Sequence, residues 1–505
     1  MKLKKFKVGV NVMESLSKIE WEFIQEDIEL INGYEISSNI GLTGVSSCII
    51  KRNEKYDLIL DIEGSFVVNS EELNVKYDVI YFIFENDDER IIANFCVFNK
   101  QHIFVNINEG FHQCLQFKVH SIEREYKNKD FESLSKVKEW YLNGPCESIM
   151  LNRRTYYFKD FPYKVHEFEK DKFKIKESQN RVSYNHSLIQ LNDCKFVLEK
   201  IMDFGPKWSN NLCIEYQNQF NIPSSETRQK IKEILSFSLG KNLIKIGESY
   251  YDENNNILKE ISFLPTISPK IDIKRLCSSY EVPAISFYGD FIDEFYFENQ
   301  LNKIISAYLD ETELNLSHIL EYLYISTGFP TESEIIMIGG CLDELAEIWF
   351  DSSKSCSNGK LIDEEKYYEL MNDELPIIKD KLKCCPDVYD KIRKSHESSG
   401  YQKVKKFLEE IDLEQGRAEK KARGHRNISA HAHAIPIETK LKMVYTTDIY
   451  RTFINRIILR LLNQDIYFDL TSFKELPITE KLPNKDFKHN YKEIKKFYRK
   501  LFESD

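Results

Sequence analysis

The chain has 505 residues, of which 42% are hydrophobic and 13% aromatic, and its formal net charge is −11. Such a composition is typical of globular proteins, and the length predicts two or three domains. The negative charge excludes a surface that is basic throughout, so any nucleic-acid site must be a local basic patch.

The first half of the chain has the residue pattern of β-strands. Apolar and polar residues alternate at 56–62 and 103–108, which predicts half-buried strands. Apolar segments at 91–98 and 115–119 predict two more, and Asn99-Lys100 predicts a turn after the first of them.

Asn143-Gly144-Pro145 predicts a break near residue 145. Beyond it, residues 225–239 predict a helix that Ser224 or Ser225 caps and Gly240 stops. Residues 242–263 then predict a β-hairpin that turns at 252–256.

Beyond Pro269 the apolar residues recur at helical spacing. The predicted helices span residues 291–309, 314–326, 331–350, 364–375, 387–395, 401–410, 413–433, 438–462 and 491–502. In the third, Thr331 and Glu334 match a capping box, and Gly339-Gly340 predicts a close approach of another helix.

These patterns predict an α+β protein of two regions. A β-rich sensor or regulatory region would span 1–267, where the break near 145 could separate two subdomains. An all-α helical bundle would span 268–505.

The 11 cysteines are scattered, and no pair has the spacing C-x-x-C. Reduced thiols are therefore expected, with no metal site and no cofactor. A third alternative is an interaction module stabilised by zinc, which Cys384 and Cys385 would bind together with Cys341 or Cys356. The spacing of these cysteines makes the site a weak candidate.

The basic residues 1–7 lack the apolar segment of a signal peptide, and no segment reaches the ~20 apolar residues of a membrane span. We therefore expect a cytoplasmic protein without a membrane partner.

Residues 423–433 contain the candidate catalytic residues Arg426, Asn427 and His431. Arginine presents a planar fork of donors to phosphate oxygens, and histidine, with a pKa near ~6.5, can move protons at neutral pH. Asparagine can orient either the phosphate or the imidazole. The neighbouring cations, Lys420, Lys421 and Arg423, are predicted to bind RNA phosphates.

The arginine-to-histidine spacing alone is a weak signal, because Arg181 and His186 fit it equally well. The later site differs in having Asn427, a helical context and a basic stretch before it. The alternative is a solvated helix surface, on which Arg423 pairs with Glu419 and Arg426 stays in water.

Arg426-Asn427-x-x-x-His431 near the end of a helix, followed by another long helix, resembles the HEPN (higher eukaryotes and prokaryotes nucleotide-binding) superfamily, and the β-rich first half ahead of it resembles the ApeA-type anti-phage proteins. The resemblance implies a metal-independent endoribonuclease of abortive infection that cuts RNA, expected to be tRNA, after a phage-derived trigger. HEPN toxins that have an antitoxin partner often carry a tyrosine where this chain has His433, so such a partnership is not expected.

Metal-free cleavage uses the 2′-hydroxyl as nucleophile, so DNA is not an expected substrate. Residues five apart lie about 140° apart around a helix. Arg426 and His431 could then meet one phosphate only if the helix ends near Ala430 or a second subunit contributes. HEPN ribonucleases place two such motifs across a two-fold axis, so we predict a homodimer with a composite site.

Two points stay open at the level of sequence. Asp343, Glu344 and Glu347 could orient the arginine, although ordinary surface carboxylates are favoured. A non-catalytic bundle that binds a nucleotide or RNA and signals by dimerisation is the alternative function.

Overall fold

The computed structural model describes residues 27–30, 33–66, 79–106, 110–145, 153–157, 164–166, 181–201, 206, 209–265, 273–277, 283–285, 296–357, 359–430, 437–469 and 478–481. The chain divides into two compact units. The first comprises residues 1–229, 241–280 and 287–302, and the second comprises residues 230–240, 281–286 and 303–505. The predicted domain boundary at 267/268 lies outside the described residues.

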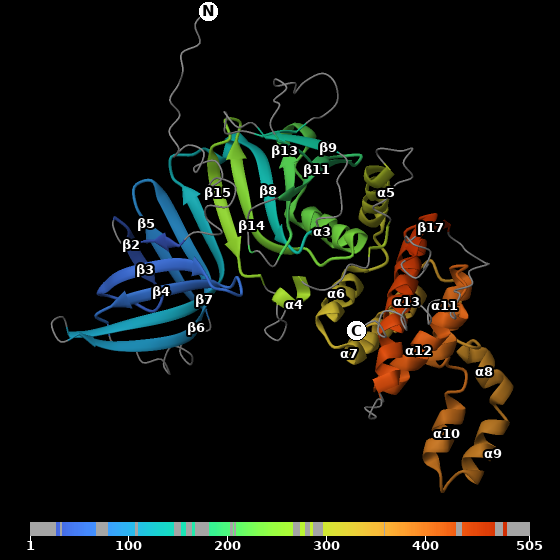
Figure 1. The fold of residues 1–505 in the computed structure, drawn as a ribbon. Helices are drawn as coiled ribbons and strands as arrows, with labels where there is room; N and C mark the ends of the chain where they lie inside the picture. Colours follow the sequence, from blue (N-terminus) through green and yellow to red (C-terminus); the bar gives the residue numbers. More distant parts are fainter. Residues whose placement is uncertain are drawn as a thin grey trace, which may run out of the picture. The chain divides into compact units, whose positions relative to one another are not determined.

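The first unit contains one antiparallel sheet of 15 strands among its described residues (Figure 1). The strands are β1 (Ile28–Glu29), β2 (Glu35–Ser38), β3 (Val45–Arg52), β4 (Leu58–Gly64), β5 (Ile80–Glu85), β6 (Glu89–Asn106), β7 (Gly110–Tyr126), β8 (Leu134–Leu142), β9 (Arg153–Tyr157), β10 (Lys164–His166), β11 (Arg181–Gln190), β12 (Lys195–Ile201), β13 (Asn211–Gln217), β14 (Ile244–Asp252) and β15 (Ile257–Phe263).

Hydrogen-bonded neighbours in this sheet follow the order β1-β3-β4-β7-β15-β14-β8-β13-β12-β11-β9-β10, and β6, β5 and β2 branch from β7. The β-rich character predicted for the first half is confirmed. Strand β8 pairs with both β13 and β14. The strands on the two sides of the predicted break near residue 145 therefore belong to one sheet.

The core of the N-terminal strands follows from their alternating pattern. On β5, Ile80, Phe82 and Phe84 are buried, whereas Tyr81 between them is exposed. Such alternation is what a sheet with one covered face requires. Phe82 packs edge-on against Phe117 of β7, with ring centroids 5.1 Å apart.

The turn predicted at Asn99-Lys100 is wrong, because β6 continues through these residues. Its pairing with β7 shifts register between Phe98 and Lys100, so Asn99 occupies a β-bulge. The Asn99 side chain donates to Gln116 Oε1 on β7 at 2.6 Å. A bulge accommodates one extra residue and bends the strand without ending it.

Helix α3 (Ser225–Leu239) forms as predicted. The backbone N–H of Thr227 donates to Ser224 Oγ at 3.2 Å, so Ser224 is the residue that caps it. Gly240 has a φ of +68°, the left-handed conformation that ends many helices. The predicted hairpin that follows is β14 and β15.

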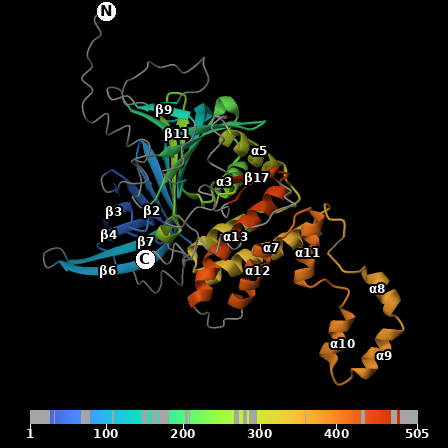
Figure 2. The same ribbon diagram turned by 45° about the vertical axis from the view of Figure 1, so that its right-hand side comes forward.

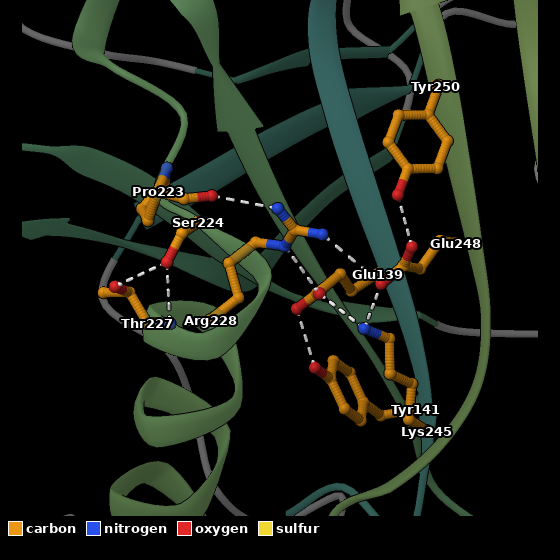
Figure 3. Close-up of polar contacts among 9 residues, drawn as sticks. All are labelled: Glu139, Tyr141, Pro223, Ser224, Thr227, Arg228, Lys245, Glu248 and Tyr250. Carbon is orange, nitrogen blue, oxygen red and sulfur yellow. Dashed lines mark hydrogen bonds and ion pairs between the residues drawn. The ribbon is translucent and has the colours of Figure 1, made fainter.

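Charged side chains fix the first turn of α3 on the sheet (Figure 3). Arg228 Nε donates to Glu139 Oε1 on β8 at 2.9 Å, and Arg228 Nη2 lies 3.4 Å from Glu248 Oε1 on β14. Lys245 Nζ bonds both carboxylates, and the hydroxyls of Tyr141 and Tyr250 donate to Glu139 and Glu248 respectively. Glu139, Glu248 and Arg228 are buried, and the two cations balance the two carboxylates.

The other α-helices among the described residues are α4 (Ile273–Cys277), α5 (Tyr296–Asp310), α6 (Ser317–Ile325), α7 (Thr331–Asp351), α8 (Glu364–Met371), α9 (Glu374–Lys381), α10 (Pro386–Arg393), α11 (Gly400–Glu410), α12 (Arg417–Ala430) and α13 (Ile437–Leu461). The helical character predicted for the second half is confirmed. The expectation of an all-α region is wrong, because β16 (Ile466–Asp469) and β17 (Ile478–Lys481) form a two-stranded sheet there. The helix predicted at 491–502 lies outside the described residues.

Two predicted helix boundaries also differ. The helix expected at 364–375 is divided, since α8 ends at Met371 and α9 begins at Glu374. The expected capping box is wrong, because Pro330 is the N-cap residue and no side chain caps α7.

Within the second unit, α7 contacts α6, α11, α12 and α13, and α12 and α13 also contact each other. Figure 2 shows α7, α12 and α13 together, with α8, α9 and α10 projecting from them as an arm. Buried Arg451 holds α13 in this bundle: its Nε donates to Glu334 Oε1 on α7 at 2.7 Å, and its Nη1 donates to Leu323 O on α6 at 2.9 Å.

Candidate functional site

Helix α12, which carries most of the predicted site, has one buried face. Ala418, Ala422, His425 and Ser429 are buried, at the spacing of one helical stripe. His425 Nδ1 lies 2.9 Å from Thr446 Oγ1 on α13. Glu419 is also buried and accepts a bond from Arg456 of α13 at 3.2 Å. These contacts fix how α12 is rotated about its axis.

That rotation directs two arginines of α12 toward one carboxylate on α7. Arg426 Nη2 lies 2.6 Å from Asp343 Oδ2, and Arg423 Nη2 lies 3.7 Å from Asp343 Oδ1. The side chains of Arg426 and Asp343 are 27% and 36% exposed, so both remain accessible from solvent. Two cations around one carboxylate leave the group with a net positive charge.

Arg423 lies deeper than Arg426 and has further contacts with α11. Its guanidinium lies over the ring of Tyr401, 5.0 Å from the centroid, and its Nη2 donates to Gly400 O at 3.3 Å. Stacking on an aromatic face stabilises a guanidinium. Arg423 therefore serves mainly to join α12 to α11.

Gly339 of α7 makes room for the stem of Arg426. A Cβ atom at Gly339 would lie 2.6 Å from Arg426 Cδ and 2.7 Å from its Cγ, whereas a Cβ at Gly340 would meet nothing within 4 Å. The predicted close approach at Gly339-Gly340 is confirmed for Gly339. Only a residue without a side chain lets the Arg426 stem lie on α7 at this point.

A buried phenol lies close to this group of charges. Burial raises the pKa of Tyr450 on α13 above the usual tyrosine value, against the opposing effect of Arg423 and Arg426. The phenol therefore stays neutral at physiological pH.

The predicted cations of α12 fall into two groups. Arg423 and Arg426 are held against α7, whereas Lys420 and Lys421 are exposed, as is Asn427. His431 lies outside the described residues, as does His433. The described part of α12 reaches Ala430, so whether the helix ends there, one condition under which Arg426 and His431 could meet one phosphate, lies outside the described residues.

The pairing expected for a solvated helix is wrong. Glu419 contacts Arg456, not Arg423, and Arg426 is held by Asp343. Of the three α7 carboxylates that were candidates to orient the arginine, Glu344 contacts His318 and Glu347 contacts Lys403.

Asp343 therefore departs from the favoured interpretation that all three were ordinary surface groups. One signal in the sequence could have identified it. Asp343 follows Gly339 by four residues, so the two share one face of α7. Tyr401 and Tyr450 carried no comparable signal.

The competing motif at Arg181 and His186 lies on β11. His186 is fully buried, opposite Glu199 of β12 in the sheet. A histidine enclosed in this way cannot reach an RNA phosphate.

Within the part of the chain that the structure describes, no helix is long and apolar enough to span a bilayer. Nor do three or more histidine, cysteine, aspartate or glutamate side chains gather there in a way that could hold a metal ion.

Comparison with known proteins gives one local likeness. The chain is similar to a biosynthetic arginine decarboxylase of Prochlorococcus marinus (strain MIT 9215), with 30% identity over 190 residues that cover 35% of this chain and 28% of that protein. The chain thus matches less than a third of the length of this curated relative. No family model and no solved structure matches the chain.

Proposed function

We propose that the chain is a metal-independent endoribonuclease of the HEPN type, with Arg426, Asn427 and His431 in its active site. The observation that carries the proposal is the contact between Arg426 and Asp343, which orients a partly exposed guanidinium beside exposed Asn427. An arginine oriented before substrate binds stabilises the charge of a phosphoryl transition state without reorganisation.

The chemistry needs no cofactor. The 2′-hydroxyl of the substrate attacks the adjacent phosphorus, and the 5′-oxygen leaves with a proton. His431 has the residue type for a proton carrier at neutral pH, and Arg426 for neutralising the phosphorane. Asn427 can donate an amide N–H to a phosphate oxygen.

A homodimer completes the proposed site. Arg426 and His431 are five residues apart, which is about 140° around a regular helix. The histidine of one copy and the arginine of another are therefore proposed to act on one phosphate. The family resemblance extends the proposal to a conditional anti-phage role, in which a phage-derived trigger releases cleavage of tRNA.

The test uses purified full-length protein incubated with total RNA, with and without phage lysate, followed by mapping of the cleaved ends. We expect 2′,3′-cyclic phosphate ends with wild type and none with Arg426→Ala or His431→Ala. Arg417→Ala is the matched control, because Arg417 is an exposed arginine in the first turn of the same helix. Unchanged cleavage by both site variants would overturn the proposal.

RNA that binds without being shortened would favour the alternative, in which the bundle binds nucleotide or RNA and signals by dimerisation. The contact with Asp343 is compatible with that function too, since a half-neutralised arginine pair still attracts phosphate.

A further inference from the structure

Two adjacent cysteines lie at the tip of the arm formed by α8, α9 and α10. Cys384 and Cys385 occupy the short connection between α9 and α10 (Figure 1), and their Sγ atoms are 3.7 Å apart. Both are exposed. The Cys385 N–H donates to Leu382 O at 2.8 Å, which closes a tight turn around the pair.

The other described cysteines differ from this pair. Of them, only Cys356 is also exposed. Burial raises the pKa of Cys48, Cys96 and Cys341 to about 12, so these thiols hold their protons at physiological pH. Because the thiolate is the reactive form, the exposed cysteines are the accessible nucleophiles.

We propose that Cys384 and Cys385 form a vicinal dithiol that small-molecule disulfides oxidise to an intramolecular disulfide. The thiolate of one cysteine attacks a sulfur of the small disulfide, and a small thiolate leaves. The second cysteine thiolate then attacks the protein sulfur of the mixed disulfide and displaces the other small thiolate. Two protein thiols are oxidised, one small disulfide is reduced to two thiols, and the two protein protons pass to the released thiolates.

The second step is favoured because the resolving thiol is already beside its target. A 3.7 Å separation is close to a near-attack distance, which greatly accelerates an intramolecular step over attack by a second small molecule. Among the described cysteines, exposed Cys356 has no second thiol in contact with it, so its reaction is expected to stop at the mixed disulfide.

The resulting link is expected to be reversible. Neighbouring Cα atoms are about 3.8 Å apart, below the usual range of about 4.4–6.8 Å for disulfides. A disulfide strained in this way is easily reduced, which is the property of regulatory disulfides.

The link also changes the start of α10, of which Cys385 is the N-cap residue. The Cys385 carbonyl accepts the N–H of Val388 at 3.0 Å, and closing an eight-membered ring must rotate the backbone next to it. No residue of α10 is buried, so no core contact holds this turn in place. Oxidation is therefore expected to loosen the first turn of α10.

The test treats the reduced full-length protein with glutathione disulfide and examines peptides by mass spectrometry. In wild type we expect the peptide containing both cysteines to lose two hydrogen atoms and to carry no glutathione. Cys384→Ser and Cys385→Ser should each retain one glutathione, as Cys356 does in every variant. Amide hydrogen exchange in α10 should rise on oxidation of wild type and return on reduction.

Glutathione retained on the wild-type peptide would overturn the proposal, as would an unmodified pair in a sample whose Cys356 is glutathionylated. Both serine variants lie on an exposed turn outside the proposed active site, so this result is independent of any ribonuclease assay.

Discussion

Arg426 Nη2 of α12 lies 2.6 Å from Asp343 Oδ2 of α7, and the Arg426 stem crosses α7 at Gly339, where a Cβ atom would lie 2.6 Å from Arg426 Cδ. A carboxylate and a glycine one helical turn apart thus hold the arginine of the proposed site.

Replacing Asp343 by asparagine should reduce RNA cleavage by roughly 10- to 100-fold, because a misplaced catalytic group loses much of its effect. Stability should change by less than about 1 kcal/mol, since the pair is partly exposed. Cleavage rates and thermal melts of the same preparation measure both effects. Glu347→Gln is the control, as Glu347 lies one turn further along α7 and contacts Lys403. Equal activity of the two variants would show that Asp343 does not orient the arginine.

Gly339→Ala should impair cleavage, because its Cβ would displace the Arg426 stem. Gly340→Ala should leave cleavage intact and stabilise the protein by up to about 1 kcal/mol, since alanine favours helix and the space there is open. Melting temperatures and cleavage rates of both variants measure this contrast. If the two variants had the same cleavage rate and the same melting temperature, the close contact between Gly339 and the Arg426 stem would be contradicted.

Replacing Lys420 and Lys421 by alanine should weaken RNA binding at low salt. The slope of log affinity against log salt should fall by about 0.7 for each phosphate contact that is lost, the value for a single strand. Filter binding across a salt series measures this slope. Lys405→Ala on α11 is the control, because Lys405 is exposed and pairs with Glu409. If only Lys405→Ala changed the slope, the RNA would bind at α11 and not at Lys420 and Lys421.

Glu334→Gln should destabilise the second unit by about 3 kcal/mol, because it leaves buried Arg451 without its carboxylate. Denaturant unfolding measures the change. Glu344→Gln, on the same helix, should cost less than about 1 kcal/mol, since its contact with His318 is exposed. Similar costs for the two variants would contradict the importance of the buried pair.

Acid should weaken the attachment of α3 in the first unit. Burial raises the pKa of Glu248, but Lys245, Tyr250 and Arg228 outweigh it, so the pKa lies below the usual glutamate value. A lowered pKa in the folded state adds stability above the unfolded pKa of about 4.3, and this stability is lost as the pH falls through the folded value.

Glu248→Gln should therefore cost about 3 kcal/mol at pH 7 and clearly less in acid, once the pH falls through the folded-state pKa of the wild-type carboxyl. Urea unfolding at pH 7 and at a series of lower pH values measures the difference. Glu253→Gln in the exposed turn between β14 and β15 is the control. A pH-independent cost would show that Glu248 acts through its shape and not through its charge.

Local patterns in the sequence sufficed for most secondary structure. The alternation at 56–62 and the 3.6-residue period of α7 and α13 reflect which side chains each element buries, and this is decided within a few residues. The same patterns predicted a turn at Asn99-Lys100 and a capping box at Thr331, and both predictions were wrong. Pairing with β7 places a bulge at Asn99, and Glu334, which was expected in the capping box, pairs with buried Arg451 of α13.

In the proposed site, too, the sequence determines some features and the tertiary structure determines others. The residue types of Arg426, Asn427 and His431, and their place near a helix end, can be read from the sequence. The choice of Asp343 over Glu344 and Glu347 cannot, because three carboxylates within five residues have the same chemistry and differ only in direction. Packing of α12 against α13 sets the rotation of α12, and Gly339 leaves room on α7 for the Arg426 stem. Tertiary structure alone therefore determined which carboxylate holds the arginine.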